Sequence, residues 1–336
     1  MRVSVLDQSP IPRGSTAAEA LADTVRLAQA CEALGYHRYW LAEHHSSDGL
    51  AGVAPEVLIA RVAAATSRIR VGAGGVMLGH YSPLKVAETF RLLENLFPGR
   101  IDLGLGRAPG SDPATAHALA YGSPVGFDTF PQKLPDLLGF LTDKLPDDHP
   151  FARVAATPRS PTAPELWMLG SSEAGASYAA HYGLPFAFAH FIQPEPADFA
   201  LSAYRRHYRP SPLYPKPRSA LAVFAIAADS DEKAERLALA RHLWRLRIER
   251  GELGPYPSDD EAAAYPYTPH DRARMAANAG RTIAGRPEAV KARIDALVAS
   301  GKADELVIVS ICHDFRDRLR SYELLAKAYG LDGALR

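Results

Sequence analysis

Residues 69–105 read IRVGAGGVMLGHYSPLKVAETFRLLENLFPGRIDLGL, and they contain one complete strand–helix–strand unit. The apolar stretch Ile69–Ala73 predicts a strand. A helix then opens at Ser82 and Pro83, because serine is a good helix cap and proline fits the first helical position. After the Pro-Gly pair that ends this helix, the apolar stretch Ile101–Leu105 predicts a second strand. Two strands joined by a helix are expected to be parallel.

The same unit recurs along the whole chain. Its first helix opens with a predicted capping box, Thr16 and Glu19, and every strand is followed by a helical pattern. The expected strands are Val3–Leu6, Arg38–Ala42, Ile69–Ala73, Ile101–Leu105, Leu166–Leu169, Phe186–Ala189, Ala220–Ala227 and Glu305–Ser310. Eight such alternations favour an α/β fold of the closed TIM (β/α)8 barrel type over an open sheet. We expect one barrel domain over residues 1–336.

Two stretches lie outside the repeat. The first, about 108–164, follows strand four and is rich in Pro, Gly and Asp; the second, about 251–285, follows strand seven. Together they account for the surplus over the roughly 250 residues of a minimal barrel. Because both follow strands, we expect both insertions to lie over the carboxyl-terminal mouth of the barrel.

Composition excludes several classes of protein. The chain has 336 residues, with 38 basic residues balanced by 38 acidic ones. This balance is unlike that of a nucleic-acid-binding protein, and no Lys/Arg cluster indicates a membrane surface. No apolar run is long enough for a signal peptide or a membrane span. Only two cysteines occur, Cys31 and Cys312, so we expect a cytoplasmic protein, although one disulfide between them stays open.

In a TIM barrel the active site lies at the carboxyl ends of the strands. Strand two ends at Glu43, His44 and His45, and adjacent side chains there point in different directions, so only one histidine is expected to face the mouth. Such a histidine suits acid, base or hydrogen-bonding work near neutral pH. The alternative is a pair of solvated loop histidines, with Glu43 a structural acceptor.

Strand three leads into Gly74 and Gly75. Paired glycines allow a backbone to approach a flat ligand closely. An ordinary turn explains the same pattern, so these glycines alone are weak support for a site.

Strand five ends at Gly170, Ser171 and Ser172, which open a helix. Free N–H groups in the first helical turn, together with hydroxyl groups, attract anions. Ser172 is equally explained as a plain N-cap. Arg107 follows the neighbouring strand four, however, and its guanidinium would give a phosphate a bidentate partner. A cofactor carrying a phosphate is therefore expected across strands four and five.

Other sites are not indicated. The chain has neither GxGxxG nor GxxxxGK[ST] spacing, no G-x-S-x-G elbow and no HExxH or cysteine pair. No metal site is expected.

Four stretches together resemble the bacterial-luciferase-like flavin monooxygenases. They are WLAEHHS (40–46), GAGGVMLGHYSPLKVAETFRLLENLFPGRIDLGLGRAPGSD (72–112), ELWMLGSSEAGASYAAHYGLPFAFAHF (165–191) and RLRSYELLAKAYGL (318–331). The resemblance covers nearly the whole chain, in order, and is weakest across 130–160 and 240–285. It is greatest to the single-subunit, non-luminescent bacterial members.

The resemblance implies a TIM barrel that binds FMN at its mouth. Reduced FMN, supplied by a separate flavin reductase, would react with O₂ and oxygenate a small organic substrate such as an aldehyde. A homodimer is expected, with neither a nucleic acid nor a membrane as partner.

The resemblance also assigns residues. His44 matches the family's catalytic histidine, Gly74-Gly75 matches a strand bulge that often holds a non-proline cis peptide, and Arg107 belongs to the phosphate site. The residues expected to contact the cofactor are Asp7, Glu43, Gly74, Gly75, Arg107, Gly170, Ser171, Ser172 and Phe188.

Two features depart from the luminescent relatives. The light-emitting subunits have a reactive cysteine just before the arginine, where this chain has Gly106, so luminescence is not expected. Residues 251–285 occupy the position of the family's mobile lid, but their sequence does not resemble that of the family. A lid that excludes water would protect a reactive intermediate.

Three other functions remain open. The first is hydride transfer by the deazaflavin F420 without O₂, and the second is a flavin-binding protein without turnover. The third is a metal-dependent barrel hydrolase, which would contain zinc. The intact EHH and LGSS motifs favour FMN.

Overall fold

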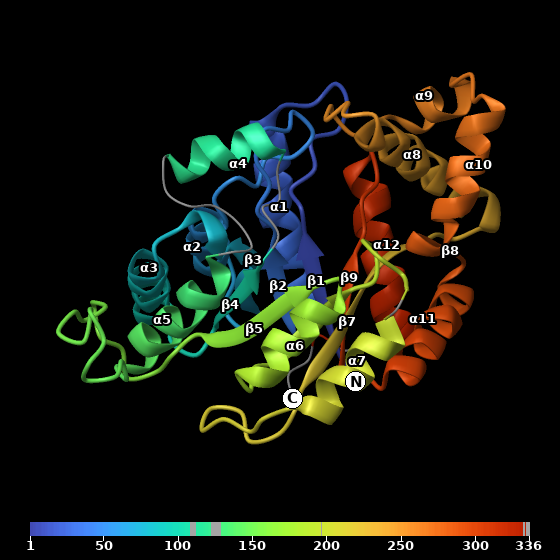
Figure 1. The fold of residues 1–336 in the computed structure, drawn as a ribbon. Helices are drawn as coiled ribbons and strands as arrows, with labels where there is room; N and C mark the ends of the chain where they lie inside the picture. The colour runs from blue at the N-terminus through green and yellow to red at the C-terminus, as the bar shows by residue number, and fades with distance from the viewer. Residues whose placement is uncertain (108–111, 122–128, 196, 332, 334–336) are drawn as a thin grey trace.

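Eight parallel strands form a closed barrel in the computed structural model, which describes residues 1–107, 112–121, 129–195, 197–331 and 333. Neighbouring strands follow the order β6-β5-β4-β3-β2-β1-β9-β7, and a β6–β7 pairing closes the ring (Figure 1). The barrel strands are β1 (Arg2–Asp7), β2 (Arg38–Leu41), β3 (Arg70–Met77), β4 (Ile101–Gly106), β5 (Glu165–Gly170), β6 (Phe186–Ala189), β7 (Ser219–Ala227) and β9 (Glu305–Val309). The predicted TIM barrel is confirmed.

Helices surround this barrel. They are α1 (Ala17–Ala33), α2 (Pro55–Ala65), α3 (Pro83–Leu96), α4 (Pro113–Ala120), α5 (Phe130–Thr142), α6 (Glu173–His181), α7 (Ala197–His207), α8 (Asp231–Glu249), α9 (Asp259–Ala264), α10 (Pro269–Asn278), α11 (Pro287–Gly301) and α12 (Phe315–Ala328), with short 3-10 turns η1 (Leu78–His80) and η2 (Ala279–Arg281). The predicted capping box of α1 is present, whereas Ser82 stands at the N-cap of α3 without a side-chain cap bond. No helix in the described ranges is both long and apolar enough to cross a membrane.

One unpredicted helix lies outside both proposed insertions and changes the description of the outer ring. No element was expected over 286–304, but α11 occupies it and packs against α7, α12 and β7. The expected helix after strand seven, α8, packs chiefly on α9 instead. Figure 1 shows α8, α9 and α10 grouped at the end of the barrel that lies away from the two termini, with α4 toward the same end.

The two proposed insertions contain regular structure. Helices α4 and α5 lie within 108–164, while 251–285 holds α9, α10 and the short strand β8 (Ile283–Gly285), which pairs with β7. Residues 108–111 and 122–128 of the first insertion lie outside the described part of the chain.

Strand alternation divides the core into two parts. Outward-facing side chains such as Val5 and Tyr39 pack with the surrounding helices. Inward-facing ones such as Leu6, Trp40 and Val307 fill the barrel, and the same cluster extends to α8. Both cysteines are buried free thiols.

The amino-terminal end of the barrel is closed by a buried ionic cluster around Arg38. Its side chain is fully buried and lies 2.7 Å from Asp102, 2.8 Å from Glu165 and 3.1 Å from Glu305. Burial works against the charge of Arg38, but the three carboxylates outweigh it and raise the pKa of Arg38. The cluster leaves the opposite end of the barrel as the open one.

Candidate active site

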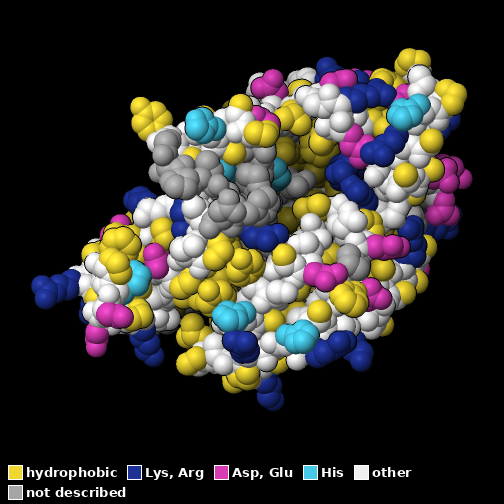
Figure 2. Space-filling view, viewed as in Figure 1, with side chains coloured by type: hydrophobic (Ala, Val, Ile, Leu, Met, Phe, Trp, Pro, Cys, Tyr) yellow, Lys and Arg dark blue, Asp and Glu magenta, His cyan; other side chains and the backbone are white. Residues whose placement is uncertain are grey.

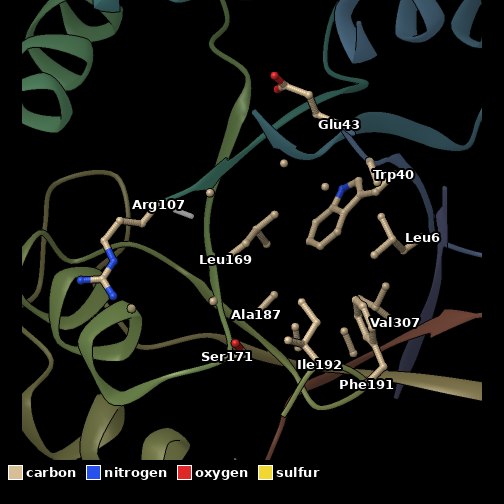
Figure 3. Close-up of a pocket in the computed structure, with 18 of the residues that line it drawn as sticks. Leu6, Trp40, Glu43, Arg107, Leu169, Ser171, Ala187, Phe191, Ile192 and Val307 are labelled. Atoms are coloured by element: carbon tan, nitrogen blue, oxygen red, sulfur yellow. The ribbon is translucent and has the colours of Figure 1, made fainter. Parts of the chain in front are cut away.

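A cavity of about 380 Å³ opens at the carboxyl ends of the strands. Figure 2 shows the molecular surface hollowed here. In Figure 3, apolar side chains surround the space, and Glu43 and Arg107 lie at its margins. Eight of the ten predicted site residues line it: Glu43, His44, Gly74, Gly75, Arg107, Gly170, Ser171 and Ser172.

The loop after β2 gives its two histidines different surroundings. His45 Nε2 lies 2.8 Å from Glu43 Oε1, so His45 is held by the carboxylate. His44 lines the cavity, and its Nδ1 atom is buried without a hydrogen-bond partner in the part of the chain described. Burial, with a smaller contribution from His45, lowers the pKa of His44 to about 4. His44 is therefore a neutral imidazole near pH 7.

Glu43 fixes the backbone around this histidine. Its carboxylate is buried and accepts hydrogen bonds from the Met77 amide, at 2.9 Å, and from the Tyr81 hydroxyl. Burial and the carboxylate raise the pKa of Tyr81. Glu43 thus ties the end of β2 to the end of β3.

The end of β3 forms one wall of the cavity. The strand has a bulge between Ala73 and Val76, and the Gly74–Gly75 peptide is cis, as the resemblance implies. A Cβ on Gly74 would lie 2.6 Å from Leu6 Cδ1, and one on Gly75 would lie 2.6 Å from the Gly104 carbonyl oxygen. Only glycine fits here without displacing the barrel wall.

A polar rim suited to an anion faces this wall. Arg107 extends from β4 and packs over the Tyr178 ring, 5.9 Å from Cζ to the ring centroid. Ser172 stands at the N-cap of α6, but its side chain makes no cap bond. The expected alternative of a plain capping serine is thus not what is observed. The hydroxyl groups, the helix N–H groups and the guanidinium border the same cavity.

Asp7 and Phe188 do not line the cavity. The Asp7 carboxylate faces outward, 2.6 Å from Arg318 and 2.6 Å from the Tyr39 hydroxyl. Burial opposes its ionisation, but Arg318 and these hydrogen bonds outweigh burial and lower the pKa of Asp7. Phe188 packs in the outer core, whereas Ala187 and Ala189 of the same strand line the cavity. Side chains alternate along a strand, so a neighbour of a cavity residue points away from it.

Sequence reasoning missed most of the apolar lining. The unpredicted lining residues are Leu6, Gln8, Trp40, Ala42, Met77, Gly106, Leu169, Gly175, Ala187, Ala189, Phe191, Ile192, Ala222 and Val307. Counting back from His44 in steps of two gives Ala42 and Trp40, so the alternation of β2 carried a usable signal.

Metal ligands are not gathered anywhere in the described ranges. No group of three or more His, Cys, Asp or Glu side chains there is placed to hold a metal ion. His190, at the end of β6, lies in a separate cavity between α7 and α11.

Comparisons with known proteins agree on one family. A sequence model described as luciferase-like monooxygenase matches residues 1–304. The uncharacterized protein YwcH of Bacillus subtilis is 48% identical, covering 97% of this chain and 98% of its own. N-acetyl-S-alkylcysteine monooxygenase of the same organism is 39% identical, with 98% of each chain covered. The crystal structure of apo-MsnO8 has a TM-score of 0.90 at 40% identity, with 98% of each chain covered. The chain therefore belongs to the luciferase-like monooxygenase family of oxidoreductases.

Proposed function

We propose that this protein is an FMN-dependent monooxygenase that uses reduced flavin and O₂ to oxygenate a small organic substrate. The observation that carries this proposal is the arrangement of the cavity. A polar rim suited to an anion lies at one margin, a glycine-lined wall faces the space, and a neutral histidine stands at the end of β2. Each of these features suits a different part of one flavin nucleotide.

The residues present fit FMN on chemical grounds. Arg107, Ser171 and Ser172 would hold the phosphate, since a guanidinium, two hydroxyls and a helix N-terminus all favour an anion. The glycine wall at Gly74 and Gly75 gives a flat ring system close access to backbone. Apolar side chains line the rest of the cavity and would enclose the ring.

Reduced FMN, when bound, supplies the two electrons with which O₂ is activated. His44, neutral near pH 7 and lining the cavity, would donate or accept a hydrogen bond at the reacting oxygen. Glu43 positions the loop that carries it. With flavin and substrate in place, the apolar lining would exclude water, which strengthens each polar contact inside.

The proposal also includes a separate reductase that supplies reduced FMN, as the family resemblance implies. The same resemblance implies a homodimer and a cytoplasmic location. The name of one relative suggests the first substrates to try. That relative is an N-acetyl-S-alkylcysteine monooxygenase, so S-alkyl thioethers belong in a substrate screen beside aldehydes.

Titration of the purified protein with FMN, reduced FMN and F420 under anaerobic conditions tests the proposal. We expect FMN, oxidised or reduced, to bind in preference to F420, and, once O₂ is admitted, formation of oxygenated product to depend on both reduced flavin and substrate. Preferential binding of F420 would replace oxygenation by hydride transfer. Flavin binding without substrate-dependent turnover would make the protein a flavin carrier, and binding of neither cofactor would refute the proposal.

A further inference from the structure

Arg241 is a buried arginine that is not paired with a carboxylate in the described part of the chain, unlike the other buried arginines. Four arginines are buried in the described part of the chain, and three of them are paired with a carboxylate: Arg38, Arg91 and Arg318. Arg241, on α8, is 6% exposed, and its Nε atom is buried without a hydrogen-bond partner among the described residues. A buried charge without a partner costs free energy.

The surroundings of Arg241 hold its guanidinium without neutralising it. The Cζ atom lies 4.3 Å from the centroid of the Phe224 ring and 5.4 Å from that of Trp244. Burial has the largest effect on the pKa of Arg241; the Tyr256 phenol opposes it, Arg245 and Arg281 add smaller effects in the same direction as burial, and together these lower the pKa to about 10. At neutral pH the group is still charged, and it packs near two aromatic rings with two further arginines close by.

Arg241 lies above the wall of the cavity already described. Along β7, Ala222 lines that cavity, and Phe224 lies two residues nearer the carboxyl end on the same face. Two residues of strand span about 7 Å. The guanidinium that packs on Phe224 therefore lies nearer the carboxyl end of the barrel than Ala222, next to the side chains that line the cavity and not among them. Figure 2 shows Lys and Arg side chains along the border of the hollow on the side of α8–α10.

We propose that Arg241 binds the carboxylate of an anionic organic substrate at the mouth of the barrel. This inference rests on the proposed function and adds its substrate class. A guanidinium forms two parallel hydrogen bonds with a carboxylate, and the aromatic rings fix its plane. The carboxylate would supply the negative charge that Arg241 lacks in the folded chain. The apolar remainder of the substrate would extend into the cavity.

Binding of benzoate and of its neutral isostere benzamide, measured by titration calorimetry without added flavin, tests this. We expect benzoate to bind at least about 10-fold more tightly than benzamide, as for a charge-assisted hydrogen-bonded pair. Arg241→Met should abolish the preference. Arg245→Gln is the matched control on the same helix, because Arg245 already pairs with Glu249 at 3.0 Å, and it should keep the preference.

A second variant separates this site from the phosphate rim. Arg107→Ala should retain the preference for benzoate, and its loss there would place the anion at Arg107 and overturn the inference. Equal binding of benzoate and benzamide by the unaltered protein, or a preference that survives in Arg241→Met, would also overturn it.

Thermal unfolding gives a readout that needs no ligand. Because methionine removes a buried unpaired charge and still packs on Phe224 and Trp244, Arg241→Met should raise the melting temperature. A fall would indicate that Arg241 is a structural residue and would count against the inference. FMN titration of the same variants keeps the two proposals apart, since failure of all of them to bind FMN refutes the proposed function and leaves the carboxylate preference to be judged alone.

Discussion

His45 Nε2 lies 2.8 Å from Glu43 Oε1, and this contact assigns different tasks to two adjacent histidines. The carboxylate holds His45, while His44 lines the cavity. The bond therefore gives the end of β2 one orientation, in which a single imidazole is presented to bound molecules.

Replacing His44 by alanine should leave FMN affinity unchanged and lower oxygenation about 10²- to 10⁴-fold, the range for a positioned acid or base. Stopped-flow oxygen kinetics and an FMN titration of the same variant measure the two quantities. Parallel loss of both would instead show that His44 supports the cavity structurally.

The pH dependence follows from the lowered pKa of His44. Its folded-state value of about 4 lies below the ordinary value of 6.5, so between these pH values the unfolded chain binds a proton that the folded protein does not. The His44 contribution to the free energy of unfolding should fall as pH drops from about 6.5 to 4. Urea unfolding of the protein and of His44→Gln across this window measures it. A contribution that grows on acidification has the wrong sign for a buried neutral histidine.

Arg107→Ala should weaken FMN binding by about 1.5–3 kcal/mol, the range for a charged hydrogen bond. Arg107→Lys should recover part of this loss, because the charge returns without the planar fork. Fluorescence titration gives both affinities. An unchanged dissociation constant for Arg107→Ala would remove this residue from the phosphate site.

Gly75→Ala should lower the free energy of unfolding by about 1–3 kcal/mol, since its Cβ would lie 2.6 Å from a backbone oxygen. Gly106→Ala is the control, because it also lines the cavity but its Cβ would meet only the Val76 oxygen, at an ordinary 3.7 Å. Denaturant unfolding compares the two. Equal stability of both variants would mean that the wall yields more readily than its packing suggests.

Arg38→Met should destabilise the protein by about 3–5 kcal/mol, because it removes a fully buried cation and leaves Asp102 with the partly exposed Arg70 and Glu305 with Arg2 and Arg218, each 3.4 Å away. Arg2→Met tests the same cluster from outside, since Arg2 is 56% exposed and 3.4 Å from Glu305. The second change should cost less than about 1 kcal/mol. Calorimetric melting measures the loss of stability in both variants. Comparable losses would show that the buried ion pairs of Arg38 contribute no more to stability than the exposed pair of Arg2.

The barrel was predictable because its signals are local. Apolar strands such as Ile101–Leu105 and helix start signals such as Pro83 are read from the sequence without tertiary information. The helix at 287–301 was not predicted, although it has a start signal of the same kind, Pro287. Phe188 was misplaced within its strand because the side that each residue faces depends on the register of neighbouring strands.

The burial of Arg241 could not be predicted from the sequence. Helix α8 reads DEKAERLALARHLWRLRIE, in which arginines recur on several faces, and buried residues are spread around the helix instead of along one stripe. Burial of one arginine is decided by Phe224 and Trp244, which only the folded chain brings together. Partners that are distant in sequence, or belong to a bound molecule, leave no local pattern.

The loops around the mouth are joined by backbone hydrogen bonds. Arg13 donates to the Tyr256 carbonyl at 2.8 Å, Tyr256 donates to that of Ile11, and Ile11 donates to Gly49 in the loop after His44. The segment after α8 is therefore bonded to the loops after β1 and β2 and cannot be exchanged independently of them. A chimera that takes residues 251–285 from a relative would break these bonds unless the loops after β1 and β2 came with it, so substrate preference in this protein should be transferable only by exchanging all three loops as a set.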